Sequence, residues 1–208
     1  MNHLCKWGVL SKARQFFALI LMVFILMLYN GNYVLAGLFF NDEPTNVWTV
    51  SSHQNYPVSY GDEFIVDIEN GEGYLINYYT KTFTKFPLMT GTTYAPTPVS
   101  EWIVKEKNIQ GNRVVFSDSG EFFRMYKNGI TRTGYGIHGY KYFKREIENG
   151  RKFLSLGCVL VADDVLDVIE ESFYANKELF NMSTREKVDL WDLLKRDNEE
   201  DPRFFYNL

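Results

Sequence analysis

Short strand-like runs separated by glycine turns occupy the middle of the sequence and most constrain its fold. Six such runs follow one another: Glu63–Ile68, Gly73–Tyr79, Thr82–Thr90, Glu101–Lys107, Arg113–Ser117 and Glu121–Tyr126. Between them stand Asn70-Gly71, Gly91, Gln110-Gly111-Asn112, Ser119-Gly120 and Asn128-Gly129. Gly and Asn-Gly supply the positive φ that tight hairpin turns need. Because aromatic residues make up 17% of the chain, strands are favoured over a helical bundle. The pattern predicts a mainly β fold, either a β-sandwich or a half-open barrel.

The sequence changes character after Cys158. Apolar residues recur at helical spacing from Asp163 to Phe173, with two acids in the first turn, where the helix dipole favours them. A second helix is predicted over Thr184–Arg196, with Ser183 or Thr184 as its cap. We therefore expect one or two C-terminal helices, with residues 176–208 forming a helical extension of the domain at 61–175.

The first 36 residues have the composition of an export signal. Lys6, Lys12 and Arg14 precede an unbroken apolar run at 16–29, and no acid occurs among them. The run is short for a membrane span, which needs about 20 apolar residues, but apolar character resumes and continues to residue 40. Residues 1–36 are therefore predicted to be a signal peptide cleaved before Gly37, or an N-terminal membrane anchor through residues 16–40. A buried helix of a cytosolic domain is the third interpretation. Export would place the rest of the chain in the periplasm or cell envelope.

The body that follows this segment is acidic and has a single thiol. The segment holds three of the 22 basic residues and none of the 26 acidic ones, which leaves 19 basic and 26 acidic residues and a net charge of −7 in the remainder. An acidic body of this kind disfavours nucleic acid binding, which needs clustered cations. No nucleic acid partner is expected. A polar, turn-rich stretch at 37–60 is predicted to be a linker. Of the two cysteines, Cys5 lies in the targeting segment, which leaves Cys158 without an internal disulfide partner.

The stretch Thr133–Cys158 contains the side chains best suited to catalysis. His138 and Cys158 are each flanked by glycine. A thiol is a modest nucleophile until a base such as imidazole removes its proton. Glycine lets the backbone turn sharply, so that adjacent N–H groups, here those of Gly157 and Cys158, can point at an oxyanion. Taken alone, the pair is a weak signal for catalysis, and a buried core cysteine with a core histidine is the favoured interpretation.

The order and spacing of these residues resemble those of the YkuD-type L,D-transpeptidases. The family motif is a histidine, a gap of about 14–17 residues, then Ser or Thr, His, Gly and Cys. Here His138 is followed by sixteen residues and then by Ser155-Leu156-Gly157-Cys158. The triplet Ile137-His138-Gly139 also fits the family pattern, and so does a helix that starts at Asp163. The resemblance covers roughly residues 63–173.

The resemblance implies a fold, a reaction and roles for individual residues. It implies an L,D-transpeptidase-like fold in which Cys158 is the nucleophile and His138 the general base. The carbonyl of Gly139 would fix the imidazole tautomer, and Gly157 would help to hold the oxyanion. The partners would be peptidoglycan stem peptides, cleaved to form 3→3 crosslinks or, with water as acceptor, hydrolysed by L,D-carboxypeptidase activity. No metal or organic cofactor is required.

Two further residues are candidates for contact with the substrate. Tyr135 lies three residues before the histidine and is expected to shape the substrate groove. Ser155 is the second candidate, although its hydroxyl is also expected to bond nearby backbone in the turn. A metal site is not expected, because the only Cys and the two His that follow the targeting segment lack ligand spacing.

Three departures from the family pattern keep other functions open. Leu156 stands where the family usually has His, Leu160 where it has Arg or Asn, and the turn at 97–100 lacks the customary glycine. An exported wall-binding module that has lost turnover is therefore an alternative. A sortase-like transpeptidase also places His before Cys, but it needs an Arg just after the cysteine, and residues 159–162 supply none. Papain-like peptidases place Cys before His.

Overall fold

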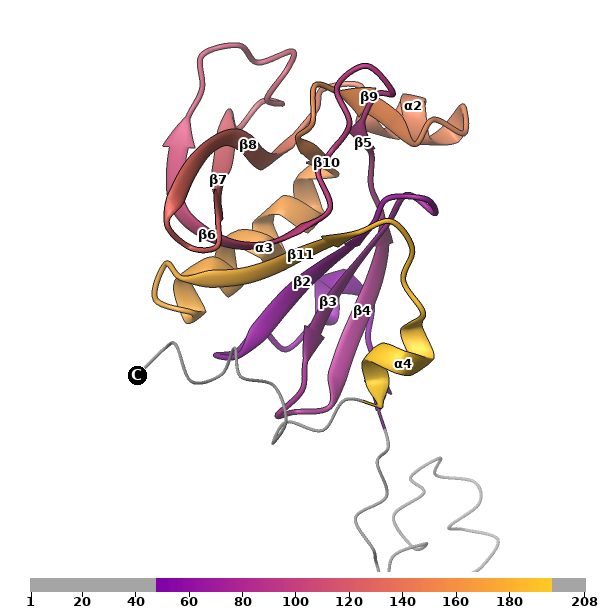
Figure 1. Ribbon diagram of the computed structural model, residues 1–208, viewed down its shortest axis with the longest axis vertical. Coiled ribbons are helices and arrows are strands. Elements are labelled where there is room, and N and C mark those ends of the chain that lie inside the picture. The colour runs from indigo at the N-terminus through magenta and orange to yellow at the C-terminus, as the bar shows by residue number, and fades with distance from the viewer. Residues whose placement is uncertain (1–47, 196–208) are drawn as a thin grey trace, which may run out of the picture. The chain divides into compact units, whose positions relative to one another are not determined.

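A computed structural model describes residues 48–195, and one curled sheet of nine strands dominates it (Figure 1). The strand order is β1-β4-β3-β2-β11-β6-β7-β8-β10. Its strands are β1 (Thr49–Val50), β2 (Asp62–Asp67), β3 (Glu72–Asn77), β4 (Thr82–Pro87), β6 (Ser100–Ile109), β7 (Glu121–Lys127), β8 (Thr131–Gly139), β10 (Val159–Val161) and β11 (Phe180–Arg185). The prediction of a mainly β fold with a few helices is confirmed.

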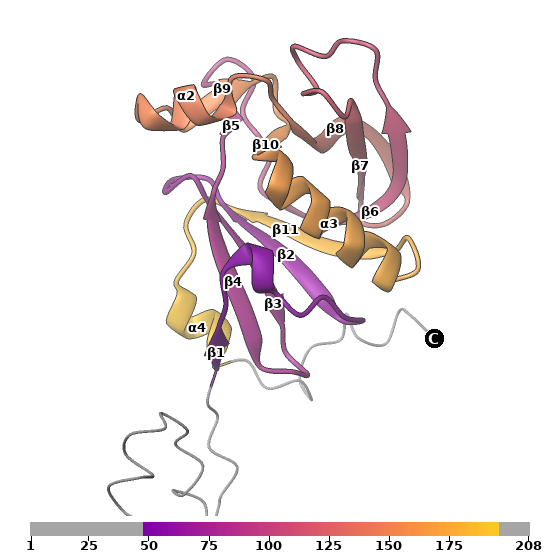
Figure 2. The same cartoon turned by 180° about the vertical axis from the view of Figure 1, so that it is seen from behind.

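Two apolar clusters cover opposite faces of the first strands. Every residue of β2 is buried, so its alternating side chains enter both clusters. Phe64 and Val66 belong to the main core, which also contains the buried face of helix α3 (Asp163–Ala175). Ile65 packs on the other face with Tyr74 and with residues of the short helix α4 (Leu190–Leu194). Figure 2 shows α3 lying across the sheet on the side that carries the main core.

Strand β11 corrects the prediction of a helix at Thr184–Arg196. Phe180–Arg185 pairs parallel with β2 and antiparallel with β6, and so joins the two halves of the sheet. The prediction was wrong because Ser183 and Thr184 resemble a helix cap, whereas their side chains lie buried within the sheet. The helix that does form is shorter, and Asp189 caps it by accepting from the backbone N–H groups of Trp191 and Asp192.

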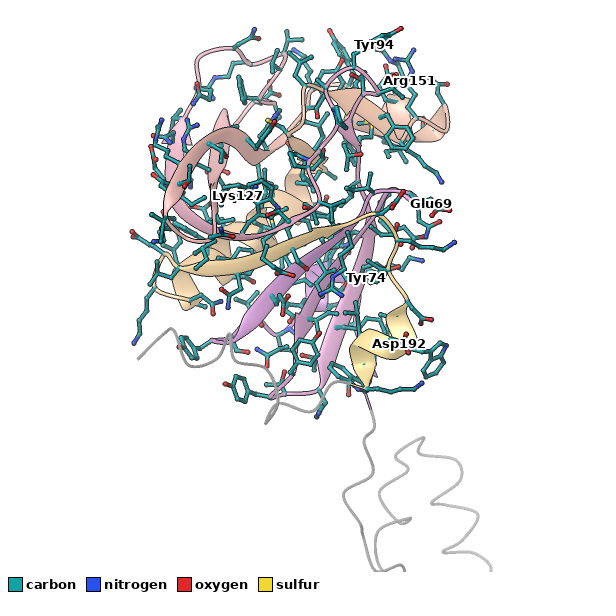
Figure 3. All side chains as sticks on the ribbon, in the orientation of Figure 1. Glu69, Tyr74, Tyr94, Lys127, Arg151 and Asp192 are labelled. Atoms are coloured by element: carbon teal, nitrogen blue, oxygen red, sulfur yellow. The ribbon has the colours of Figure 1, made fainter. Side chains whose placement is uncertain are left out.

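Two other predicted strands differ in the structure. Residues 113–117 form turns, because the Asn112 side chain accepts from the N–H groups of Val114 and Val115, and Ser117 has a φ of 55°. The run at 82–90 is broken after Pro87, and its end, β5 (Thr90–Gly91), pairs with β9 (Phe153–Ser155) in a separate two-stranded sheet. Tyr94, in the loop that follows β5, points into solvent with 98% exposure (Figure 3).

The helix predicted from Asp163 is confirmed, and a second helix was not predicted. Helix α3 begins two residues after β10 and buries five side chains along one face. The unpredicted helix α2 (Phe143–Glu148) lies between β8 and β9, and buried Phe143 joins Met89 and Leu160 in a small third cluster. A 3₁₀ turn, η1 (His53–Asn55), precedes β2. Together β9, α2 and the turns beside them form the connection from β8 to β10.

The predicted export segment, residues 1–36, lies outside the described residues. Within residues 48–195, no helix is long and apolar enough to cross a membrane. The described part of the predicted linker carries β1, which pairs with β4, and η1, so residues 49–55 already contribute to the folded unit.

Candidate active site

The last three strands of the sheet bring His138 and Cys158 to one face. In the antiparallel pair of β7 and β8, Phe122 lies opposite His138 and Arg124 opposite Gly136. In the parallel pair of β8 and β10, Leu160 lies beside His138. Paired residues point to the same face of a sheet, and the side-chain period is two. Cys158, two residues before Leu160, therefore shares the face of His138 and lies beside Gly136.

The opposite face of these strands belongs to the main core. Phe123, Ile137 and Val159 are fully buried there. His138 and Cys158 instead line a cavity of about 540 Å³. Its other lining residues are mostly apolar or aromatic: Gln110, Val115, Phe116, Phe122, Arg124, Gly134, Tyr140, Leu154, Ser155, Leu156 and Leu160. Of these, Arg124 is the only side chain with a permanent charge.

The turn before Cys158 needs glycine at position 157. Gly157 has a φ of +104°, which favours glycine. A side-chain carbon there would also lie 2.4 Å from Cε1 of Tyr135. The turn is tied by Ser155, whose hydroxyl donates to the Cys158 carbonyl at 2.6 Å and accepts from the Gly157 N–H at 3.1 Å. The expected backbone bonding of Ser155 is confirmed. The oxyanion contact expected of the Gly157 N–H stays a prediction, because this N–H donates to Ser155 in the structure.

The imidazole of His138 is held by its neighbours. Its Nδ1 lies 2.8 Å from the Gly139 carbonyl oxygen. A carbonyl only accepts, so the neutral ring carries its proton on Nδ1 and leaves the Nε2 lone pair as the basic site. The rings of Phe116 and Phe122 lie 4.7 and 5.7 Å from the imidazole, centroid to centroid. Thus the expected hydrogen bond from Nδ1 of His138 to the Gly139 carbonyl is present.

Burial shifts the pKa of both groups toward their neutral forms. His138 is 4% exposed, and burial lowers its pKa, although backbone hydrogen bonds with Gly139 and Val115 act in the opposite direction. Burial raises the pKa of the Cys158 thiol, while a backbone hydrogen bond with Gly136 and the charge of Arg124 favour the thiolate. At neutral pH the resting pair is therefore a thiol and a neutral imidazole, as general-base activation requires.

Gly139 also occupies a crowded position. A side-chain carbon there would lie 2.4 Å from Oδ1 of Asp163 and 2.5 Å from Oγ of Ser117. The lack of a side chain thus lets the end of β8 approach the start of α3. This close approach fixes the carbonyl that accepts from His138.

Tyr135 packs against the main core and not at the cavity. It alternates with Gly136 on β8, so its ring lies on the core side, 6.1 Å from the Trp102 ring, centroid to centroid. It does not line the cavity, and its contact is with the turn at Gly157. Tyr135 lies against the turn that carries Cys158, and its contact with a substrate stays a prediction. Tyr140 is the tyrosine near His138 that does line the cavity.

Sequence reasoning missed the residues that β7 and the loop before it supply. Phe116, Phe122 and Arg124 all line the cavity, but they lie outside the motif. The alternation of Phe122 and Arg124 along a predicted strand was the available signal. That signal needed the register with β8 before it could be linked to His138.

The two leucines that depart from the family pattern differ in burial. Leu156 is 80% exposed and lines the cavity, whereas Leu160 is 3% exposed. The backbone of Leu160 exchanges two hydrogen bonds with Met89, of 3.0 and 2.8 Å.

Within residues 48–195, no group of three or more Cys, His, Asp or Glu side chains is placed to hold a metal ion.

Comparisons with known proteins give a likeness of fold. No protein-family model and no curated protein matches the chain. Protein Bd1075 of Bdellovibrio bacteriovorus aligns at 15% identity, covering 71% of this chain and 56% of that one, with a TM-score of 0.48. An L,D-transpeptidase from Xylanimonas cellulosilytica aligns at 15% identity over 62% and 63%, with a TM-score of 0.43. One from Enterococcus faecium aligns at 16% identity over 61% and 50%, with a TM-score of 0.42.

The chain thus spans 50–63% of the length of these three structures. At such identities the likeness is one of fold alone, and the chain's own residues carry the functional proposal made below.

Proposed function

We propose that this protein is an exported L,D-transpeptidase of peptidoglycan, with Cys158 as nucleophile and His138 as general base. The observation that carries the proposal is the pairing of β8 with β10, which sets both side chains on the wall of one cavity. The Gly139 carbonyl holds Nδ1 of the imidazole, so Nε2 is the atom that accepts a proton. The order and spacing of the His and Cys motif support the same reaction.

The first half of the reaction transfers the donor peptide to the protein. Sγ of Cys158 attacks the carbonyl carbon between the third and fourth residues of a tetrapeptide stem, while Nε2 of His138 takes the thiol proton. The oxyanion forms beside the backbone N–H of Cys158. As the carbon–nitrogen bond breaks, the imidazolium returns the proton to the leaving amine. A D-amino acid departs and a thioester remains on Cys158.

The second half of the reaction resolves the thioester. His138 removes a proton from the incoming amine of a neighbouring stem, the amine attacks the thioester carbonyl, and the thiol of Cys158 is regenerated with that proton. The product is a 3→3 crosslink. Water in place of the amine gives L,D-carboxypeptidase activity by the same steps, so the acceptor alone distinguishes the two activities.

The composition of residues 1–36 supports export. A basic start followed by an apolar run directs a chain out of the cytoplasm, either as a cleaved signal or as an anchor through residues 16–40. The proposed substrate occurs in the periplasm or cell envelope, so this localisation and this reaction require each other. Detection of the protein in the cytoplasm alone would contradict the proposal.

The proposal is tested by release of the terminal D-amino acid from a tetrapeptide stem. The wild-type protein should release it, and a second stem should give a crosslinked product detectable by mass. Cys158→Ser and Cys158→Ala should abolish both, with a thermal melt close to that of wild type. A large loss of stability in both variants, together with turnover that survives, would identify Cys158 as a core residue and overturn the proposal.

A wall-binding module without turnover is the second candidate. Leu156 and Leu160 favour it, because they place apolar groups where the family has polar ones. Such a module would bind peptidoglycan equally well in the wild-type and Cys158→Ala forms and would release no amino acid. Sedimentation with insoluble peptidoglycan, measured beside the release assay, distinguishes the two functions.

A further inference from the structure

Arg124 brings a positive charge to the cavity from a strand outside the motif. Leu160, whose side chain is buried and apolar, stands at the motif position where a polar group is usual. Arg124 lies on β7, opposite Gly136, and its charge favours the thiolate of Cys158. Its side chain is 14% exposed, so water screens this charge less than it would at the surface.

The guanidinium of Arg124 is held in place while part of it stays available. It lies over the Phe122 ring at 4.9 Å, and Nη1 donates to the Thr133 carbonyl at 2.8 Å. Nε is buried without a hydrogen-bond acceptor, although an oxygen of Glu106 lies 3.6 Å away. Among the described residues, none accepts a hydrogen bond from Nη2.

Glu106 does not use up this charge, because other groups engage its carboxylate. Arg132 donates to both oxygens at 3.1 Å, and Tyr126 and Asn108 donate at 2.8 and 2.9 Å. These hydrogen bonds, with Arg132 first, lower the pKa of Glu106 to about 2. The carboxylate is therefore ionised and already supplied with donors, and it meets Arg124 only at a distance longer than a hydrogen bond.

We propose that Arg124 binds a carboxylate of the peptide substrate beside Cys158 and thereby selects peptides with an anionic group next to the scissile bond. The geometry that carries this is a planar cation fixed by Phe122 and Thr133 in an otherwise uncharged cavity that also contains the thiol. Guanidinium matches the two oxygens of a carboxylate. The identity of the peptide rests on the proposed function, whereas the affinity for a carboxylate does not.

Two alkylating reagents test the carboxylate preference without any turnover. Iodoacetate transfers a carboxymethyl group to the Cys158 thiolate, iodoacetamide transfers a carbamoylmethyl group, and both release iodide. Only the group from iodoacetate carries a carboxylate. The ratio of their rates cancels the thiolate fraction, which Arg124 also changes. In Arg124→Gln we expect this ratio to fall about tenfold, the size of a lost hydrogen bond between charged groups.

Arg145→Gln is the matched control. Arg145 also lies over an aromatic ring, that of Tyr142, and pairs with a carboxylate, that of Glu146, but it does not line the cavity, so the ratio should stay at the wild-type value. If Arg124→Gln does not fold, Arg124→Lys replaces it, because it keeps the charge and loses the planar fork; a severalfold fall is expected. An unchanged ratio in a folded Arg124 variant would overturn the proposal.

Amidated peptides then identify which carboxylate is bound. One tetrapeptide has its C-terminal carboxylate amidated, and another has the side-chain carboxylate of its third residue amidated. The amidation that removes the contact should raise KM about tenfold in wild type and change it little in Arg124→Gln. If neither amidation does so although turnover is present, the substrate role of Arg124 is contradicted. Absence of turnover would contradict the proposed function, while the alkylation ratio still decides the carboxylate affinity.

Discussion

Burial favours the neutral forms of both the His138 imidazole and the half-buried Cys158 thiol. Charging either group inside the cavity costs free energy, because the surrounding rings cannot replace water. Proton transfer between them would create a thiolate and an imidazolium together, and each would stabilise the other. This arrangement suits a nucleophile that is activated as the substrate binds rather than one stored as a thiolate.

The pH dependence of turnover should reflect the pKa of His138. Its folded-state pKa lies below the ordinary value of 6.5, so the imidazole loses its proton, and becomes a competent base, as pH rises through a value below 6.5. We expect the acidic limb of kcat/KM to have its midpoint below pH 6.5. The profile of kcat/KM against pH measures this. A rise centred above pH 6.5 would contradict a neutral base at this site.

Gly157→Ala should disrupt the turn that presents Cys158. The positive φ costs about 1–3 kcal/mol for a residue with a side chain, and the clash with Tyr135 adds about as much again. Turnover should fall strongly, because the thiol moves. Gly150→Ala is the control: its φ is +74°, and no atom lies within 4 Å of the added carbon. Chemical denaturation should give the control the smaller loss. Equal losses would show that the Tyr135 contact is unimportant.

At the scale of elements, the crossover from β8 to β10 explains the spacing of the motif. Parallel neighbours require a connection that returns to the same end of the sheet. Here α2 and β9 supply it within the residues that separate His138 from Cys158. The motif and its glycines were readable from the sequence. Arg124 was not, because its place beside the thiol depends on register across β7 and β8, which includes a bulge.

Thr184 on β11 should contribute to the union of the two halves of the sheet. Its hydroxyl accepts from Nε1 of Trp102 at 2.8 Å and also lies within hydrogen-bond distance of the Pro98 carbonyl. Thr184→Val leaves the buried indole N–H without a partner, so we expect a loss of about 1–3 kcal/mol in the free energy of unfolding. Thr131→Val, at an exposed position of β8, should change it by less than about 0.5 kcal/mol. Urea unfolding measures both, and similar values would contradict this account of β11.

At the scale of the whole molecule, β11, a strand late in the sequence, joins the two halves of the sheet at its middle. The early strands and the helix at Asp163 were predicted correctly, because hairpins and amphipathic helices leave local patterns. The pairing of β11 with β2 joins segments more than a hundred residues apart. No local pattern encodes such a contact, and Ser183-Thr184 imitated a helix cap.

Truncation should therefore distinguish the domain end predicted from the sequence, residue 175, from an end at residue 195. A chain that ends at residue 195 keeps every strand of the sheet and should melt cooperatively near the temperature of the full chain. A chain that ends at residue 175 loses β11, exposes the buried edges of β2 and β6, and should not fold. Circular dichroism during heating measures both. A cooperative melt in the shorter chain would contradict the central place of β11.

Acylation of Cys158 by a carbapenem tests the central claim most directly, because these β-lactams acylate active L,D-transpeptidases through the nucleophilic thiol. The folded protein should gain the mass of one carbapenem. Peptide mapping should place the adduct on Cys158, and His138→Gln should form it much more slowly. Folded wild-type protein that gains no mass, or that gains it at another residue, would contradict the account of Cys158 and His138 as a nucleophile and its base.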